Sequence, residues 1–319
     1  MKPLDITELK RLMVAELERR RCADDAFSYS RKPGGPEALY GLTGALNVLA
    51  ALGLPLGDHE ERHRKAVRIL SYRDAEGHFD GGSGPGHGLH MVMGALHLLG
   101  EPLPREIRPL APTDPSLLPA WLDRHDWGST HKELCGQTIP LLAGGRVGGE
   151  WIDVFVRDIS GRLDPDRPLE TWCAPDDPSW RVISCVYHVF SAFDAGRIPY
   201  PRPHLLAERL MNLRWEDAPE EEQRTVCTDG DWAWLLLRLG EQIPHNAAPA
   251  LEAIRRVSAR RVRAWHEDRE AVLALDTHHL FCYLWVTAVF QSCVRDHYRG
   301  GYVRDTLNDP ALFRLFGPS

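Results

Sequence analysis

Two carboxylates separated by a single residue occur in the segment Cys227-Thr-Asp229-Gly-Asp231. An aspartate at the start of a helix usually serves as the N-cap, which accepts hydrogen bonds from the first turn. Capping explains only one member of such a pair, so both residues are candidates for acid–base chemistry. A carboxylic acid can protonate a weakly basic group if burial or neighbouring negative charge holds its proton. We therefore predict acid–base chemistry for Asp229 and Asp231 acting together.

Aromatic residues are frequent in the apolar segments around this pair. Ring faces stabilise cations, and aromatic side chains commonly line ligand cavities. We expect a cavity wall made of Trp180, Tyr187, Trp232, Trp234, Phe281, Tyr283 and Trp285.

Histidines form a third group of candidates. His87 and His90 are three residues apart and would share one face of a helix. His131 lies at the start of the next expected apolar helix, after Trp127, and His279 lies at the start of the last one. Together with the carboxylates these imidazoles could form a metal site, whereas each alone is better explained as a polar residue at the rim of a cavity. We predict substrate contacts for His87, His90, His131, Trp127 and Asp177.

The elements that must position these residues are helices of two kinds. Helices charged on one face are expected at 6–21, 59–72, 117–125, 150–159, 203–213 and 248–266. Helices that are apolar on most sides are expected at 36–52, 88–99, 130–142, 179–193, 231–239 and 278–293. The two kinds alternate along the chain, which gives six helical hairpins.

The starts of the apolar helices recur with a period of about 48 residues, as in a repeat array. Apolar helices enclosed by amphipathic ones predict an all-α fold, an (α/α)6 toroid formed as a single domain from residues 1–319. A HEAT-like superhelix and two bundles divided near residue 110 are the alternatives. Parallel inner helices would place six N-terminal ends, each carrying partial positive charge, at one mouth.

A resemblance to a known superfamily rests on two segments. Asp74-Ala-Glu-Gly-His-Phe-Asp-Gly-Gly resembles the repeat of the terpenoid cyclases and protein prenyltransferases. Asp229 and Asp231 correspond to the first two acids of the Asp-x-Asp-Asp motif of class II terpene cyclases, with Trp232 in the third place. The resemblance implies a toroid in which Asp231 is the acid that protonates a hydrophobic, isoprenoid substrate, with Asp229 as its partner, and no cofactor is expected for this reaction.

Other functions use the same residues. In the prenyltransferases an Asp-x-Cys pair and a histidine bind zinc. The resemblance therefore implies an alternative, metal-dependent prenyl-transfer or hydrolytic enzyme, with zinc or another divalent ion on Asp229, Asp231 and His279. A ligand-binding toroid without catalysis is a further alternative. An α/α-barrel glycosidase or polysaccharide lyase is another, because Trp172, Asp176, Asp177 and Trp180 would suit a sugar.

Composition limits the partners. The net charge of −7 argues against nucleic-acid binding, and the basic stretch from Arg255 to Arg263 reads as a solvated helix face. Seven scattered cysteines fit reduced thiols, and no apolar run reaches the length of a membrane-spanning helix. We expect a cytoplasmic protein that acts on a hydrophobic small molecule. The apolar residues in 309–319 are expected either to pack across the barrel or to form a homodimer contact.

Overall fold

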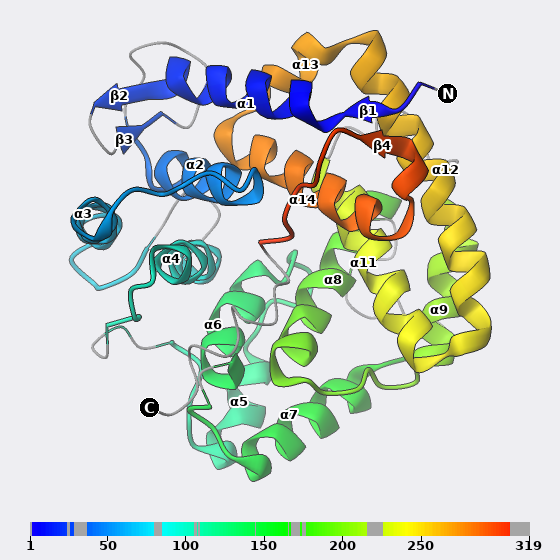
Figure 1. Cartoon of the computed structure of the whole chain (residues 1–319). Helices are drawn as coiled ribbons and strands as arrows, with labels where there is room; N and C mark the ends of the chain where they lie inside the picture. The colour runs from blue at the N-terminus through cyan, green and yellow to red at the C-terminus, as the bar shows by residue number, and fades with distance from the viewer. Residues whose placement is uncertain are drawn as a thin grey trace.

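The computed structural model describes residues 2–23, 26–28, 37–79, 85–104, 107, 109–143, 145–164, 166, 173, 177–215 and 226–306 (Figure 1). Most of these residues are helical, which confirms the expected all-α class. The strands are only two or three residues long. β1 (Leu4–Asp5) pairs in parallel with β4 (Tyr298–Arg299), and β2 (Arg21–Ala23) pairs antiparallel with β3 (Ala26–Phe27).

Six helices contact one another in a cycle. The helices are α2 (Leu39–Ala51), α4 (Pro85–Leu99), α6 (Lys132–Ala143), α8 (Ser179–Gly196), α11 (Val226–Gln242) and α14 (Thr277–Cys293). Each packs on the next one in this order, and α14 packs on α2 (Figure 1). They correspond in order to the six apolar segments of the sequence, and their buried residues lie on most sides of each helix.

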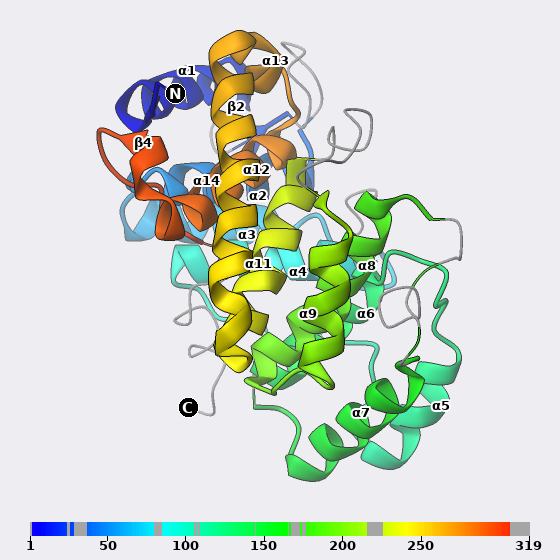
Figure 2. The ribbon, with the colours of Figure 1, turned by 90° about the vertical axis from the view of Figure 1, so that its right-hand side faces the viewer.

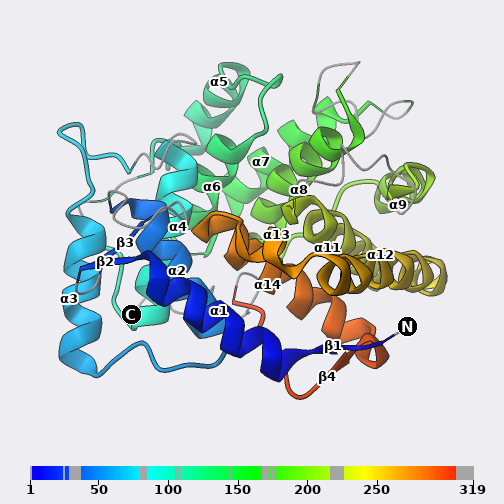
Figure 3. The ribbon, with the colours of Figure 1, turned by 90° about the horizontal axis from the view of Figure 1, so that it is seen from above.

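The amphipathic helices lie outside this cycle. They are α1 (Ile6–Arg20), α3 (His59–Leu70), α5 (Leu118–Asp123), α7 (Gly149–Arg162), α9 (Pro203–Asn212), α12 (Ala247–Glu267) and the short α13 (Arg269–Leu273). Figure 2 shows α12 running along α11, and Figure 3 shows α3 beside α2 and α4. Three 3₁₀ turns, η1 (Pro115–Leu117), η4 (Pro244–Asn246) and η5 (Arg295–His297), complete the described helices.

Glycines allow the inner helices to approach closely. A Cβ atom at Gly136 of α6 would lie 1.7 Å from the carbonyl oxygen of Gly86 in α4. At Gly44 of α2 it would lie 3.0 Å from the carbonyl oxygen of Thr277 in α14. A side chain at Gly136 would therefore push the two backbones apart.

The segment after β4 covers the C-terminal ends of α2 and α14. The Gln291 amide donates to the carbonyl of Gly301 and accepts from the backbone N–H of Val303. The N–H of Arg304 donates to the carbonyl of Ala51, at the end of α2. The expected packing of 309–319 lies outside the described residues, so neither the barrel nor the dimer interpretation is tested there.

Helix boundaries differ from expectation at one important place. The inner helix expected at 231–239 begins at Val226, so Asp229 and Asp231 lie inside its first two turns. Asp276, in contrast, is the N-cap of α14 and accepts from the N–H of His279, and Asp114 caps η1. Among the described residues no helix is both long and apolar enough to cross a membrane.

Candidate functional site

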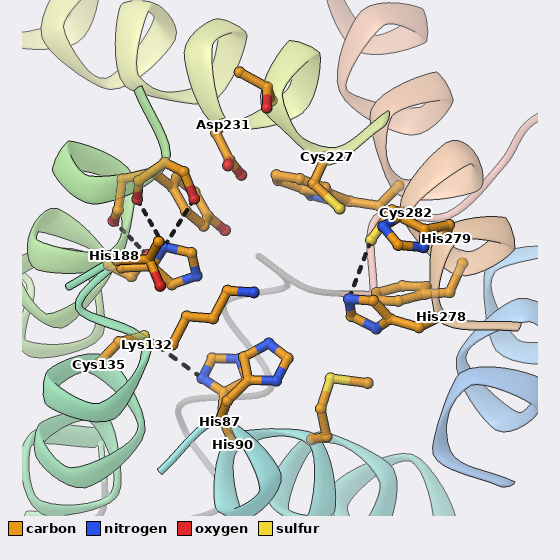
Figure 4. A pocket seen from close by; sticks show the side chains of 18 of the residues that line it. His87, His90, Lys132, Cys135, His188, Cys227, Asp231, His278, His279 and Cys282 are labelled. Atoms are coloured by element: carbon orange, nitrogen blue, oxygen red, sulfur yellow. Dashed lines mark hydrogen bonds between the residues drawn. The ribbon is translucent and has the colours of Figure 1, made fainter. Parts of the chain in front are cut away.

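A cavity of about 190 Å³ lies between the six inner helices, and each of them contributes side chains to its wall (Figure 4). Most of these side chains come from the first two or three turns, such as Tyr40 of α2, His87 of α4, Lys132 of α6 and Asp231 of α11. The N-terminal ends of all six helices therefore border the cavity. Unpaired N–H groups at these ends contribute positive potential.

Two sulfurs and one imidazole meet on the wall formed by α11 and α14. Donor atoms of Cys227, His278 and Cys282 all lie within 4.8 Å of one another. The Cys282 Sγ is 3.7 Å from the Nε2 of His278. Hydrogen bonds from Cys282 and His278 hold the pKa of Cys227 well below its usual value, and the pKa of Cys282 is raised by the same contact with Cys227 and by burial. The pKa values of the two thiols are therefore shifted in opposite directions.

Neighbouring rings fix the orientation of His278. Tyr40 stacks on it with ring centroids 5.5 Å apart and an interplanar angle of 27°. His87 meets it edge-on at 5.6 Å, and the Tyr40 hydroxyl is hydrogen-bonded to the Nδ1 of His87. The Nδ1 of His278 itself is buried and has no hydrogen-bond partner among the described residues.

His279 forms a second pair on the same helix. Its Nδ1 is 2.5 Å from the Oδ2 of Asp276, and this hydrogen bond raises the pKa of the imidazole. His279 lines the cavity, while Asp276 holds the ring in place and also caps the helix. A carboxylate bonded to one ring nitrogen leaves the other nitrogen available to a ligand.

The two carboxylates of α11 face different surroundings. Asp231 lies one turn after Cys227, lines the cavity and is 3% exposed. Burial raises its pKa well above the usual value, and the nearby Cys227 adds to the shift. A raised pKa favours the protonated form of this carboxyl group.

Asp229 belongs to an ion-pair network behind the cavity. Its carboxylate accepts from the Nε1 of Trp215 at 2.7 Å, from Arg260 at 3.0 Å and from Arg261 at 2.7 Å. Residues two apart on a helix point to nearly opposite sides. The two carboxylates therefore make no direct contact. The basic stretch 255–263, expected as a solvated helix face, is so only in part, because Arg260 and Arg261 pair with the buried Asp229 while Arg255 and Arg256 pair with Asp296 and Glu252.

The wall opposite Cys227 and Cys282 carries His90, His188, Cys135 and Lys132 (Figure 4). Cys135 Sγ is 3.8 Å from the Nδ1 of His90, and the Nδ1 of His188 donates to the carbonyl of Ser184 at 2.7 Å. Burial lowers the pKa of His90 to about 4 and that of His188 to about 3. Both imidazoles are therefore neutral at pH 7.

Comparison with known proteins gives no further guide. No family model, curated protein or solved structure matches this chain. The function must be inferred from the cavity itself.

The expected site residues divide into two groups. Those that line the cavity are Trp180, Tyr187, Phe281, Trp285, His87, His90, His279 and Asp231. Those that lie away from the cavity are Trp232, Trp234, Tyr283, His131, Trp127, Asp177 and Asp229.

The residues away from the cavity have structural partners. The indole of Trp232 donates to the carbonyl of Leu210, and that of Trp234 donates to Asp194. Tyr283 packs on Trp265 and Arg261. The remaining contacts are those of Asp177 with Arg181, of His131 with His125, and of Trp127 with His125 and Arg162. Trp172 and Asp176 lie outside the described residues.

The sequence analysis did not predict that Cys227, His278 and Cys282 form one cluster. Cys227 and Asp231, and likewise His278 and Cys282, are each four residues apart, which places them on one face of a helix. That spacing at the starts of two successive inner helices was the available signal. Lys132, Cys135 and His188 also line the cavity, and their signal is the same early position in an inner helix.

Proposed function

We propose that the six inner helices form a closed α/α toroid and that its cavity is the active site of a metal-dependent hydrolytic or group-transfer enzyme. The observation that supports this function is the convergence of Cys227, His278 and Cys282 on one side of an enclosed cavity. The metal set differs from the one expected from the sequence, since it uses two sulfurs and His278 in place of Asp229, Asp231 and His279.

The donor atoms suit zinc. Zinc binds thiolate sulfur at about 2.3 Å and imidazole nitrogen at about 2.0 Å in tetrahedral geometry, so two such donors stand roughly 3.5 Å apart. The 3.7 Å separation of the Cys282 Sγ and the His278 Nε2 is close to that value. Both sulfur donors and the imidazole are inward-facing residues in the first two turns of α11 and α14.

Other side chains of the cavity would carry out the remaining steps. A zinc ion with three protein ligands keeps a fourth position for water or substrate and acts there as a Lewis acid. Asp231, whose pKa is raised by burial, would donate a proton to a departing or weakly basic group. Trp180, Phe281 and Trp285 would hold the apolar part of a substrate and exclude water.

Metal analysis of tag-free protein tests the proposal. We expect about one equivalent of zinc per chain, and its loss in Cys227→Ser and Cys282→Ser. Cys293→Ser is the matched control, because its thiol bonds to carbonyls of its own helix and does not line the cavity. Less than about a tenth of an equivalent of any transition metal in the parent protein would refute a metal enzyme.

Protonation of an isoprenoid remains a second candidate, supported by a buried acid that shares a cavity with an aromatic wall. Asp231 is 3% exposed, and Trp180, Tyr187, Phe281 and Trp285 line the same space. This function predicts turnover of an isoprenoid that is lost in Asp231→Asn and retained after the metal is removed. Loss of turnover on metal removal would exclude this candidate.

A further inference from the structure

Lys132 brings an ammonium group into the cavity, and no described residue forms an ion pair with it. It is the first residue of α6, is only partly exposed, and extends its ammonium group toward the middle of the cavity (Figure 4). Within the described parts of the chain the Lys132 ammonium has no hydrogen bond or ion pair. Enclosing a charged group without a partner costs free energy, and folded proteins usually pair such groups.

The surroundings of Lys132 carry little other charge. Among the described residues that line the cavity there is no second lysine or arginine, and Asp231 is the one carboxyl group. The carboxyl of Asp231 forms no ion pair with the ammonium among the described residues; burial raises its pKa, and the charge of Lys132 lowers it in part. The N-terminal ends of six helices add positive potential. Cys227 and Asp231 also line the cavity, but neither forms a hydrogen bond or ion pair with Lys132 among the described residues. A bound anion would give the ammonium the direct partner that it lacks.

We propose that the substrate carries a carboxylate, which binds to the ammonium of Lys132 and so places the rest of the molecule across the cavity against Cys227, His278 and Cys282. This inference deepens the proposed function and rests on it, because it takes the cavity as the active site. Lys132 is then a substrate-binding residue that sets the orientation of the reacting group.

The charge balance favours a carboxylate over a phosphate. One ammonium matches one negative charge, whereas a phosphate carries between one and two near neutral pH and is usually bound by several donors or cations. His90 and His188 cannot supply the missing charge because they are neutral at pH 7. Thr228 and Trp285, which also line the cavity, each have a buried polar atom without a partner among the described residues. A carboxylate offers only acceptors and so complements such donors.

Three ring compounds of similar size test this assignment. Benzoate, benzamide and phenylphosphonate would be titrated calorimetrically into the 319-residue protein at pH 7. A second series would use the Cys227→Ser/Cys282→Ser variant, in which a carboxylate cannot bind to a metal held by the thiolates. In both the parent protein and this variant we expect benzoate to bind about tenfold more tightly than benzamide, which is the gain expected from one charged hydrogen bond.

Variants of Lys132 decide the role of the ammonium. In Lys132→Met the preference for benzoate over benzamide should fall to about one, while Lys132→Arg should keep most of it. Lys65→Met is the control, since Lys65 lies on the outer helix α3 and bonds to the carbonyl of Leu56. Circular dichroism would verify that each variant keeps its helices.

Three results would overturn the inference: an unchanged preference in Lys132→Met, tighter binding of phenylphosphonate than of benzoate, or no binding of benzoate at about 10 mM. Metal content measured on the same samples separates this failure from that of the proposed function. Lysine-dependent benzoate binding in a parent protein without metal would refute the metal enzyme alone. A protein that contains metal but binds benzoate equally well with and without the Lys132 ammonium would refute the carboxylate assignment alone.

Discussion

Replacing Asp229 by asparagine should destabilise the protein without altering the cavity. The side chain is 1% exposed and accepts from Trp215, Arg260 and Arg261. Asparagine keeps the shape but removes the charge, so both guanidinium groups lose their carboxylate. The side chains of Arg260 and Arg261 are 20% and 13% exposed, which leaves them little water as a substitute.

The expected size follows from these contacts. Removing one partner of a buried ion pair costs about 3–5 kcal/mol, and the partial exposure of the arginines places this case near 3 kcal/mol. Unfolding entropy of about 2.1 cal/mol/K per residue over 319 residues gives roughly 0.67 kcal/mol/K. The melting temperature should therefore fall by about 4–5 °C.

Thermal melts followed by circular dichroism would measure this shift, with Asp231→Asn as the matched control. Asp231 makes no hydrogen bond or ion pair among the described residues, and burial raises its pKa toward the neutral form that asparagine mimics. Its amide variant loses no contact and should melt within about 1–2 °C of the parent. The reverse ranking, a large shift for Asp231→Asn and none for Asp229→Asn, would refute the division of roles between the two carboxylates.

Three further predictions concern the core, acid stability and the metal. Gly136→Val should destabilise the protein by more than about 3 kcal/mol in urea unfolding, because its side chain would meet the backbone of Gly86; a stability equal to the parent would show that α4 and α6 are less tightly packed. Burial lowers the pKa values of His90 and His188 to about 4 and about 3 in the folded protein. As the pH falls below about 6.5, the unfolded chain therefore binds protons that the folded chain does not bind. The free energy of unfolding should decrease by at most about 2 kcal/mol per histidine between pH 7 and pH 5. Urea titrations from pH 7 to 5 should show this loss, and a His90→Gln/His188→Gln variant should show a smaller slope. Chelation should lower the melting temperature of the parent and leave that of Cys282→Ser unchanged, since binding at about 100 times Kd contributes about 2.7 kcal/mol.

The helical order could be predicted from the sequence because it depends on hydrophobic periodicity. Alternating amphipathic and apolar segments match the outer and inner helices in order, and the ends of α14 differ from expectation by a single residue. The start of α11 was placed five residues late, because Cys227, Thr228 and Asp229 are weak helix formers. Their helical conformation depends on tertiary contacts, such as the ion pairs of Asp229 with α12.

The cavity was harder to predict, because it depends on the rotation of each helix about its own axis. The residue type alone does not show which tryptophan faces the cavity: Trp285 lines it, whereas Trp232 is buried between α11 and α9. Asp229 and Asp231 were paired by their closeness in sequence, whereas helix geometry places them on different faces. Cys227 lies about 50 residues before His278 and Cys282, so their contact depends on how α11 packs on α14 and could not be predicted from local sequence.

The contact between α2 and α14 has a consequence for the order of folding. These helices are more than 220 residues apart in sequence, and their packing joins the first inner helix to the last. Closing so long a loop is entropically costly, and contacts of large sequence separation form slowly. During synthesis the earlier helices can pack pairwise, yet Tyr40 cannot stack on His278 until α14 has been made. The cavity thus comes into being as one of the last events of folding, and no partial chain that lacks α14 can contain it.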